Sequence, residues 1–308
     1  MTMFKQTFIL PGILCFVLAA NAQTVKLYRY KDLVFPDVTV KRDLSYAPAG
    51  SVSKKKYNLF DLYLPKDDKA KLRPLIIWMH GGGFIFGTKE AKGIELWSKS
   101  FAQRGYVCAA INYSLSKTPL FHSYDLKKSC YYAVQDAKTA VKYFRQHHAD
   151  YNIDPDKIIL AGNSAGGIIA LQAAYCNDAD LAKMAGLPDP DPKHDEVLKV
   201  AGVINFWGGI LDLNWLKNTR VPIVSVLGSN DKIVNPTHKN ESFYGGEDIH
   251  TQANTLGIPN ELKVFDGYAH ELQKHFNPVF SVGKSTKKRW LEAGQFAAVF
   301  LYSSVFKY

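Results

Sequence analysis

The sequence predicts an α/β protein with a mostly parallel central sheet, helices on both faces and an antiparallel pair of strands at the N-terminal end. From residue 75 onward, short apolar runs alternate with helical segments. This alternation is typical of a parallel sheet that is covered on both faces. Ahead of these runs, two segments alternate apolar and polar residues, as half-exposed antiparallel strands do. The 308 residues, 47% of them hydrophobic, supply enough material for one large core.

The antiparallel pair is expected at Val38–Tyr46 and Tyr57–Leu64. The clearest helix follows later in the chain, where small and apolar residues recur three or four positions apart between Ala133 and Phe144. Six runs are expected to form strands covered on both faces: Leu75–Met79, Tyr106–Asn112, Lys157–Ala161, Val200–Phe206, Pro222–Leu227 and Glu261–Phe265.

The N-terminus has the pattern of a secretory signal peptide. Lys5 supplies the positive charge, Phe8–Ala20 is apolar, and Ala20-Asn21-Ala22 forms a small-residue cleavage site. At about 13 residues the apolar run is short for a membrane span, although an uncleaved anchor is the alternative. We therefore expect a signal peptide at residues 1–22, a single domain at residues 23–308 and a secreted or periplasmic location. After cleavage we expect no integral membrane span.

Three cysteines remain after cleavage at this site, namely Cys108, Cys130 and Cys176. An odd number in an oxidising compartment cannot pair completely. We expect buried thiols, with a Cys130–Cys176 disulfide as the alternative.

The chain carries a formal net charge of +10. Its lysines are scattered, and the longest tight cluster is only the three residues at 54–56. A solvated basic surface explains this charge as well as a nucleic-acid partner would. We therefore expect no nucleic-acid binding.

A G-x-S-x-G motif at residues 162–166 directly follows the strand expected at Lys157–Ala161, and a helical pattern begins at Ile168. In this strand–turn–helix context the motif is typical of a nucleophilic serine. The turn is so sharp that side chains at positions 162 and 166 would collide with neighbouring strands. It leaves the hydroxyl of Ser164 at a helix N-terminus, where the helix dipole favours developing negative charge.

A second glycine-rich loop, H-G-G-G-F at residues 80–84, follows the buried strand at Leu75–Met79. Without Cβ atoms, its backbone N–H groups can approach a ligand closely. Paired with the serine turn, this loop predicts an oxyanion hole with Gly82, Gly83 and Ala165 as donors. We expect a structural role for His80.

These two loops resemble those of the α/β-hydrolase fold, specifically the esterase/lipase branch that is similar to hormone-sensitive lipase and carries H-G-G-G. The strand at 106–115 also resembles that branch, although Ser114 stands where arginine is common. The resemblance covers roughly Tyr57 to Phe300. It implies a mostly parallel sheet and a catalytic triad in the chain order serine, acid, histidine.

The implied acid lies just after the next-to-last strand, in the loop at residues 228–234. Asp231 fits this position, because Asp212 follows its strand too closely and Asp266 lies too near the expected histidine. The implied base follows the last strand, where His270 stands. Ser164, Asp231 and His270 are therefore the predicted triad.

These parts specify acyl transfer to water through an acyl-enzyme intermediate. We expect a serine carboxylesterase, because an alkoxide leaves more easily than an amine. A peptidase on the same triad and a catalytically inactive binding protein are the alternatives. Four aromatic residues next to the catalytic loops are hypothetical substrate contacts, although they could equally belong to the core: Phe84, Phe86, Trp207 and Tyr268.

Short gaps after two of the strands leave no room for a large lid, which favours short or bulky soluble esters. If the protein is secreted, carbohydrate-linked acetyl or feruloyl esters outside the cell are also candidate substrates. Neither a cofactor nor a metal is expected. His270 and His275 are five residues apart, whereas the zinc motif H-E-x-x-H needs four.

Overall fold

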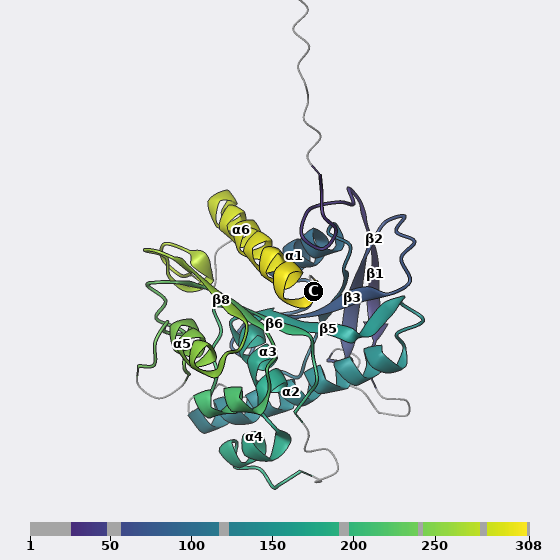
Figure 1. Cartoon of the computed structure of the whole chain (residues 1–308). Helices are drawn as coiled ribbons and strands as arrows, with labels where there is room; N and C mark the ends of the chain where they lie inside the picture. The colour runs from purple at the N-terminus through teal and green to yellow at the C-terminus, as the bar shows by residue number, and fades with distance from the viewer. Residues whose placement is uncertain are drawn as a thin grey trace, which may run out of the picture.

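The computed structural model describes residues 26–47, 57–116, 123–190, 197–239, 243–277 and 282–306. Its core is an eight-stranded sheet in the order β1-β2-β4-β3-β5-β6-β7-β8 (Figure 1). β1 pairs with β2 and β2 with β4 in antiparallel fashion, and the remaining neighbours are parallel. The strands are β1 (Val38–Ser45), β2 (Leu59–Pro65), β3 (Arg73–Met79), β4 (Val107–Ile111), β5 (Ile153–Asn163), β6 (Gly202–Phe206), β7 (Ile223–Gly228) and β8 (Asn260–Phe265).

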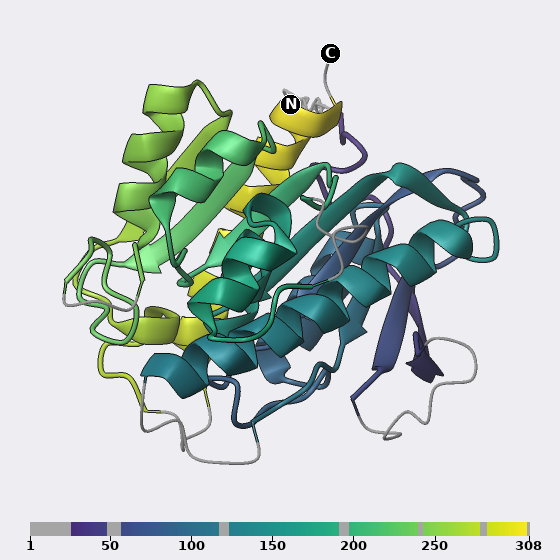
Figure 2. The ribbon, with the colours of Figure 1, turned by 90° about the horizontal axis from the view of Figure 1, so that it is seen from below.

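Helices cover both faces of this sheet. In Figures 1 and 2, α1 and α6 lie together on one face, and α2, α3, α4 and α5 lie on the other. The helices are α1 (Lys92–Ala102), α2 (Ser123–Gln146), α3 (Ala165–Tyr175), α4 (Asp178–Met184), α5 (Gly246–Leu256) and α6 (Lys284–Leu301). Short 3-10 turns occur at η2 (Leu213–Asn218) and η3 (His270–Leu272), and a π-helical turn, η4 (Tyr302–Phe306), follows α6.

The alternation of side chains along each central strand divides the core into two parts. On β3, Leu75, Ile77 and Met79 pack under α2 and α3, whereas Ile76 and Trp78 face α1 and α6. All five are fully buried. Because successive side chains point to opposite faces, a strand covered on both sides must be apolar at every position. The expected strands are therefore observed, and the fold class is confirmed.

The last expected strand differs in its burial. Glu261–Phe265 was expected to be covered on both faces, but β8 pairs only with β7, and Val264 is 40% exposed. This strand closes the sheet at an edge, where solvent reaches its charged residues.

Cys108, Cys130 and Cys176 are buried free thiols. Burial raises the pKa of each of them, to about 12 in Cys130. The alternative Cys130–Cys176 disulfide is not formed. The expected signal peptide at residues 1–22 lies outside the described residues. Within those residues, no helix combines the length and apolar character that a bilayer span requires.

Candidate active site

Ser164 lies in the sharp turn between β5 and α3. Its backbone has φ 53° and ψ −120°, in the left-handed half of φ/ψ space that non-glycine residues rarely enter. The turn is held from both sides, because the Ser164 N–H donates to the carbonyl of Phe206 at 2.8 Å and its own carbonyl accepts from Ile168 at 3.0 Å. The side chain therefore stands at the carboxyl end of the sheet and at the N-terminus of α3.

The glycines around Ser164 are required by close approach. A Cβ at Gly166 would lie 1.9 Å from the carbonyl oxygen of Met79, on the neighbouring strand β3. A Cβ at Gly162 would lie 2.3 Å from the carbonyl carbon of Gly166. The collision expected at position 162 is thus with the turn itself and not with a neighbouring strand. Both contacts are shorter than a real Cβ can make, so only glycine fits.

Three polar side chains that are distant in sequence form one hydrogen-bonded chain. Nε2 of His270 lies 2.8 Å from Oγ of Ser164, and Nδ1 lies 2.7 Å from Oδ2 of Asp231. Ser164 is 9% exposed, and the other two are 2% exposed. The structure therefore brings the serine, the histidine and the carboxylate expected from the sequence together.

Asp231 is held by the loop that carries it. Its Oδ1 accepts the backbone N–H groups of Ile233 at 2.8 Å and Val234 at 3.0 Å, which leaves Oδ2 for the imidazole. The other aspartates lie elsewhere: Asp212 caps η2 through the N–H of Asn214, and Asp266 accepts from Ser229.

The glycine loop turns its backbone toward Ser164. Gly82 and Gly83 have φ values of 115° and 60° and line the same cavity as Ser164. Within the described part of the chain, the N–H groups of Gly82 and Gly83 have no hydrogen-bond acceptor. The N–H of Ala165 opens α3, where a helix offers it none. The two loops that meet at Ser164 therefore carry three backbone N–H donors without an acceptor among the described residues.

His80, the first residue of this loop, is fixed in the core by its contacts with Tyr113. It is 1% exposed, its ring stacks on Tyr113 with centroids 4.3 Å apart, and its carbonyl accepts the Tyr113 hydroxyl at 2.8 Å. Burial lowers its pKa to about 4, so the ring is neutral at pH 7. Asn163 holds Gly81, the residue after His80, because its Oδ1 accepts the Gly81 N–H at 3.2 Å. The sequence did not single out Asn163, although it stands next to the expected nucleophile.

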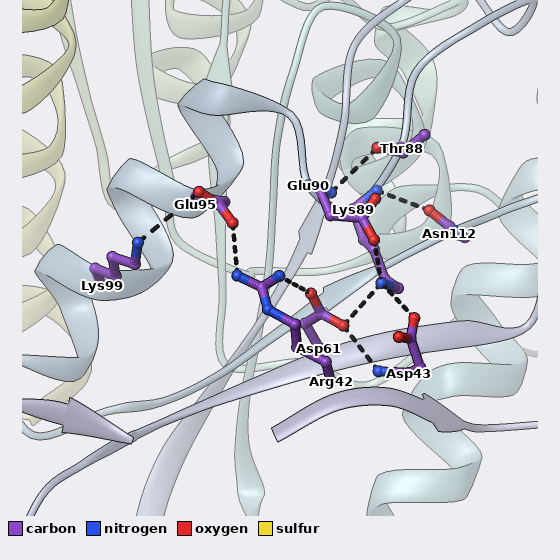
Figure 3. A network of polar contacts seen from close by, with 9 residues as sticks. All are labelled: Arg42, Asp43, Asp61, Thr88, Lys89, Glu90, Glu95, Lys99 and Asn112. Carbon is purple, nitrogen blue, oxygen red and sulfur yellow. Dashed lines mark hydrogen bonds and ion pairs between the residues drawn. The ribbon is translucent and has the colours of Figure 1, made fainter. Parts of the chain in front are cut away.

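A buried cation, Lys89, follows the glycine loop in the chain and lies at the centre of a network of carboxylates (Figure 3). Lys89 is 1% exposed, its Nζ lies 2.8 Å from carboxylate oxygens of Asp43 and Asp61, and it pairs with Glu90. Its backbone N–H donates to Asn112 at 2.7 Å. Burial acts to lower the pKa of Lys89, but its three carboxylate partners outweigh burial and raise the pKa above its ordinary value.

The same three carboxylates lie close enough together to be considered as metal ligands. In this structure the Lys89 ammonium stands among them and supplies the positive charge. Asp43 reaches the cluster from a bulge in β1, with a φ of 55°. This arrangement ties the N-terminal strands to the segment that follows the glycine loop and carries no argument for a metal.

A cavity of about 300 Å³ opens over the serine. Besides the catalytic side chains and glycines, apolar groups dominate its wall, and three of them are unusually exposed: Phe86 at 57%, Ile233 at 58% and Ile85 at 45%. The remaining described lining residues are Glu271, Gln273, Phe276, Asn277 and Val282. Exposed apolar side chains beside a nucleophile fit an apolar part of a substrate.

Of the four aromatic residues considered from the sequence, only Phe86 lines this cavity. Phe84 and Trp207 are buried in the core, and Tyr268 packs against Arg289, whose guanidinium lies 4.1 Å from the ring centroid. A large aromatic ring beside a catalytic loop can pack into the core or contact a substrate. Its position in the sequence therefore could not distinguish a core residue from a substrate contact.

The BD-FAE family model matches residues 60–245, which is well over half of the chain. The chain belongs to the BD-FAE family. The matched range contains Ser164 and Asp231 and ends before His270.

Curated relatives of this BD-FAE protein are described as esterases. Esterase LipQ of Mycobacterium tuberculosis is 30% identical over 141 residues, which cover 45% of this chain and 30% of LipQ. Arylacetamide deacetylase of Bos taurus is 33% identical over 118 residues, which cover 37% of this chain and 27% of that protein. The chain thus spans less than a third of either relative.

Solved structures confirm the α/β-hydrolase fold of this BD-FAE protein. Esterase 2 of Thermogutta terrifontis in its native form has a TM-score of 0.58 and 23% identity, with 87% of this chain and 92% of that chain covered. The same esterase phosphorylated by paraoxon has a TM-score of 0.59 and 23% identity, with 90% and 97% covered. At this identity the likeness establishes the fold alone.

Proposed function

We propose that this protein is a serine carboxylesterase that uses Ser164, His270 and Asp231 as its catalytic triad. The observation that carries the proposal is the buried chain of hydrogen bonds from Ser164 Oγ through His270 to Asp231. A merely structural serine would not need a strained backbone, a base at 2.8 Å and free N–H donors around it. The esterase names of the curated relatives support the same activity.

In the proposed mechanism, Oγ of Ser164 attacks the ester carbonyl carbon while its proton passes to Nε2 of His270. The carbonyl oxygen becomes negative and accepts hydrogen bonds from Gly82, Gly83 and Ala165. The C–O bond to the alcohol then breaks, and the His270 proton goes to the leaving oxygen. Water repeats the sequence on the acyl-enzyme and releases the acid, with Asp231 stabilising the imidazolium in both halves.

For the substrate, we propose short-chain acyl esters or carbohydrate-linked esters that carry acetyl or feruloyl groups. The apolar wall formed by Ile85, Phe86, Ile233 and Phe276 supports an apolar acyl group of limited size in a cavity of about 300 Å³. The Thermogutta esterase has been solved with bound butyrate and with bound propionate, which are both short-chain carboxylates. We propose export through residues 1–22 on the sequence pattern alone, because these residues carry the features of a signal peptide.

The test is hydrolysis of p-nitrophenyl esters of increasing chain length, with an aminoacyl anilide alongside. We expect ester turnover that is fastest for short chains and little release of the anilide. Paraoxon should label Ser164, and Ser164→Ala should lose labelling and nearly all turnover while remaining folded. Labelling of another residue would reject the assignment, and faster cleavage of the anilide would favour a peptidase.

A further inference from the structure

The cavity over Ser164 contains one charged side chain besides the catalytic residues. Among its described lining residues there is no lysine or arginine, and Glu271 is the only acid. Asp231 is not one of these lining residues and pairs with His270. The rest of the described wall consists of glycines, apolar side chains and two amide side chains. Glu271 therefore sets the charge that a molecule meets beside the nucleophile.

No cation neutralises this carboxylate in the described part of the chain. One oxygen of Glu271 accepts from Gln273 at 3.1 Å, and the other receives no hydrogen bond from a described residue. Glu271 also forms no ion pair with a described lysine or arginine. Lys92 lines an adjoining cavity of about 250 Å³ that Glu271 also lines, but Lys92 is exposed, so water and salt screen its charge.

Glu271 lies close to the reacting groups. It follows His270 directly in the chain, and its carboxylate interacts electrostatically with both His270 and Asp231. Burial raises the pKa of Glu271, as expected for a carboxylate that is partly removed from water. Charges at a partly buried site interact more strongly than charges in bulk water. The negative charge of Glu271 therefore acts on whatever occupies the cavity.

This charge acts against carboxylates in particular. Hydrolysis of an ester leaves a carboxylic acid at the serine, and the acid ionises at neutral pH. In a cavity of about 300 Å³, two carboxylates disfavour the state in which both are charged. A substrate that carries a carboxylate of its own meets the same repulsion before the reaction, whereas an uncharged ester does not.

We propose that Glu271 is a specificity-determining residue whose negative charge excludes esters that carry a carboxylate and weakens the binding of the carboxylate product. The protein is thereby selective for uncharged esters. This proposal rests on the esterase function proposed above. It gives Glu271 no part in bond making or breaking, because Ser164, His270 and the N–H donors of the two loops supply that chemistry.

The experiment compares two esters of similar shape that differ in charge, ethyl 4-nitrobutanoate and monoethyl glutarate. A nitro group and a carboxylate are both planar and similar in size, but only the carboxylate is charged at neutral pH. The measured quantity is the ratio of kcat/KM for the nitro ester to kcat/KM for the glutarate ester, followed by titration of the released acid.

We expect a ratio well above one in the wild type and a ratio about 10-fold lower in Glu271→Gln, because the repulsion between like charges is lost. The amide keeps the size of the side chain and an acceptor for Gln273. A second measurement needs no turnover. The dissociation constant of butyrate, measured by titration calorimetry, should also fall about 10-fold in Glu271→Gln.

Glu292→Gln is the matched control, since Glu292 lies on α6, pairs with Lys263 and is absent from the described lining of both cavities. It should change neither quantity. A purely structural role of Glu271 would slow both esters equally and leave the ratio unchanged.

A wild-type ratio near one, an unchanged ratio in Glu271→Gln or unchanged butyrate binding in that variant would overturn the assignment of Glu271 and leave the esterase function intact. Absence of any ester turnover, together with no labelling of Ser164 by paraoxon, would instead overturn the esterase function and the selectivity that rests on it.

Discussion

The indole N–H of Trp290 donates to the carbonyl of Glu271 at 2.7 Å. Through this bond, α6 holds the turn that carries His270. Arg289 adds a second bond from the same helix, because its Nε donates to the carbonyl of Leu272 at 2.8 Å. Glu271 and Leu272 both have positive φ values, 57° and 56°, so the turn is strained and depends on these contacts.

Trp290→Phe should therefore disturb catalysis more than packing. A smaller aromatic ring still fills part of the space, but the Glu271 carbonyl loses its donor and the turn can relax away from Ser164. Misplacement of a catalytic group by about 1 Å can cost 10²-fold, so we expect kcat to fall about 10-fold or more. Trp215→Phe, in η2 and away from the turn, is the control. Equal effects of the two substitutions on kcat would contradict the positioning role.

Gly82 and Gly83 are predicted to respond differently to alanine. A Cβ at Gly82 would lie 2.0 Å from the carbonyl oxygen of Phe86, so the loop must shift and withdraw a donor from the oxyanion. Loss of one such donor costs about 10²–10³ in kcat. A Cβ at Gly83 meets nothing within 4 Å, and Gly83→Ala should lower kcat much less. Measured kcat values for both variants, at matched folding by circular dichroism, decide the point. A larger loss in Gly83→Ala would argue against this loop geometry.

Lys89→Met is expected to lower both stability and kcat. The substitution leaves the buried Asp61 with Arg42 as its one cationic partner among the described residues, and removing one partner of a buried ion pair costs about 3 kcal/mol. The loop that starts at His80 also loses its anchor. Lys138→Met is the matched control, because Lys138 is similarly buried and its Nζ lies 2.7 Å from Asp178 on the other face of the sheet. Urea unfolding should show both variants destabilised, with kcat reduced only in Lys89→Met.

Acid should destabilise the protein through its buried histidines. Burial lowers the pKa of His250 from 6.5 to about 4. As the pH falls through this window, the unfolded chain therefore binds a proton that the folded chain does not bind. Stability is fully present above pH 6.5 and declines toward pH 4, by about 2–3 kcal/mol for this residue. His250→Gln should flatten the dependence of unfolding free energy on pH. An equally steep decline in the variant would show that His250 is not responsible.

Local sequence was enough to predict the strands and the serine turn. A strand covered on both faces has few polar positions, which is why β3 could be recognised from the apolar run at residues 75–79 alone. The glycines at positions 162 and 166 are likewise demanded by backbone contacts within or beside one turn. Asp231 and His270 needed the chain order of a known fold, because nothing in their own neighbourhoods distinguishes them from other loop residues.

What the sequence by itself determined about this protein is therefore the mostly parallel sheet, the ends of its strands and the residues placed at them. Only the tertiary structure decided which side chains meet there. Phe84 and Phe86 are two residues apart, yet the first is fully buried and the second is 57% exposed at the cavity. Glu271 lines the cavity over Ser164, and its backbone carbonyl is held by Trp290 on α6, 19 residues further along the chain. The physical reason is that hydrophobic periodicity and turn chemistry act over a few residues, whereas burial, cavities and hydrogen-bond partners depend on chain segments that meet only after folding.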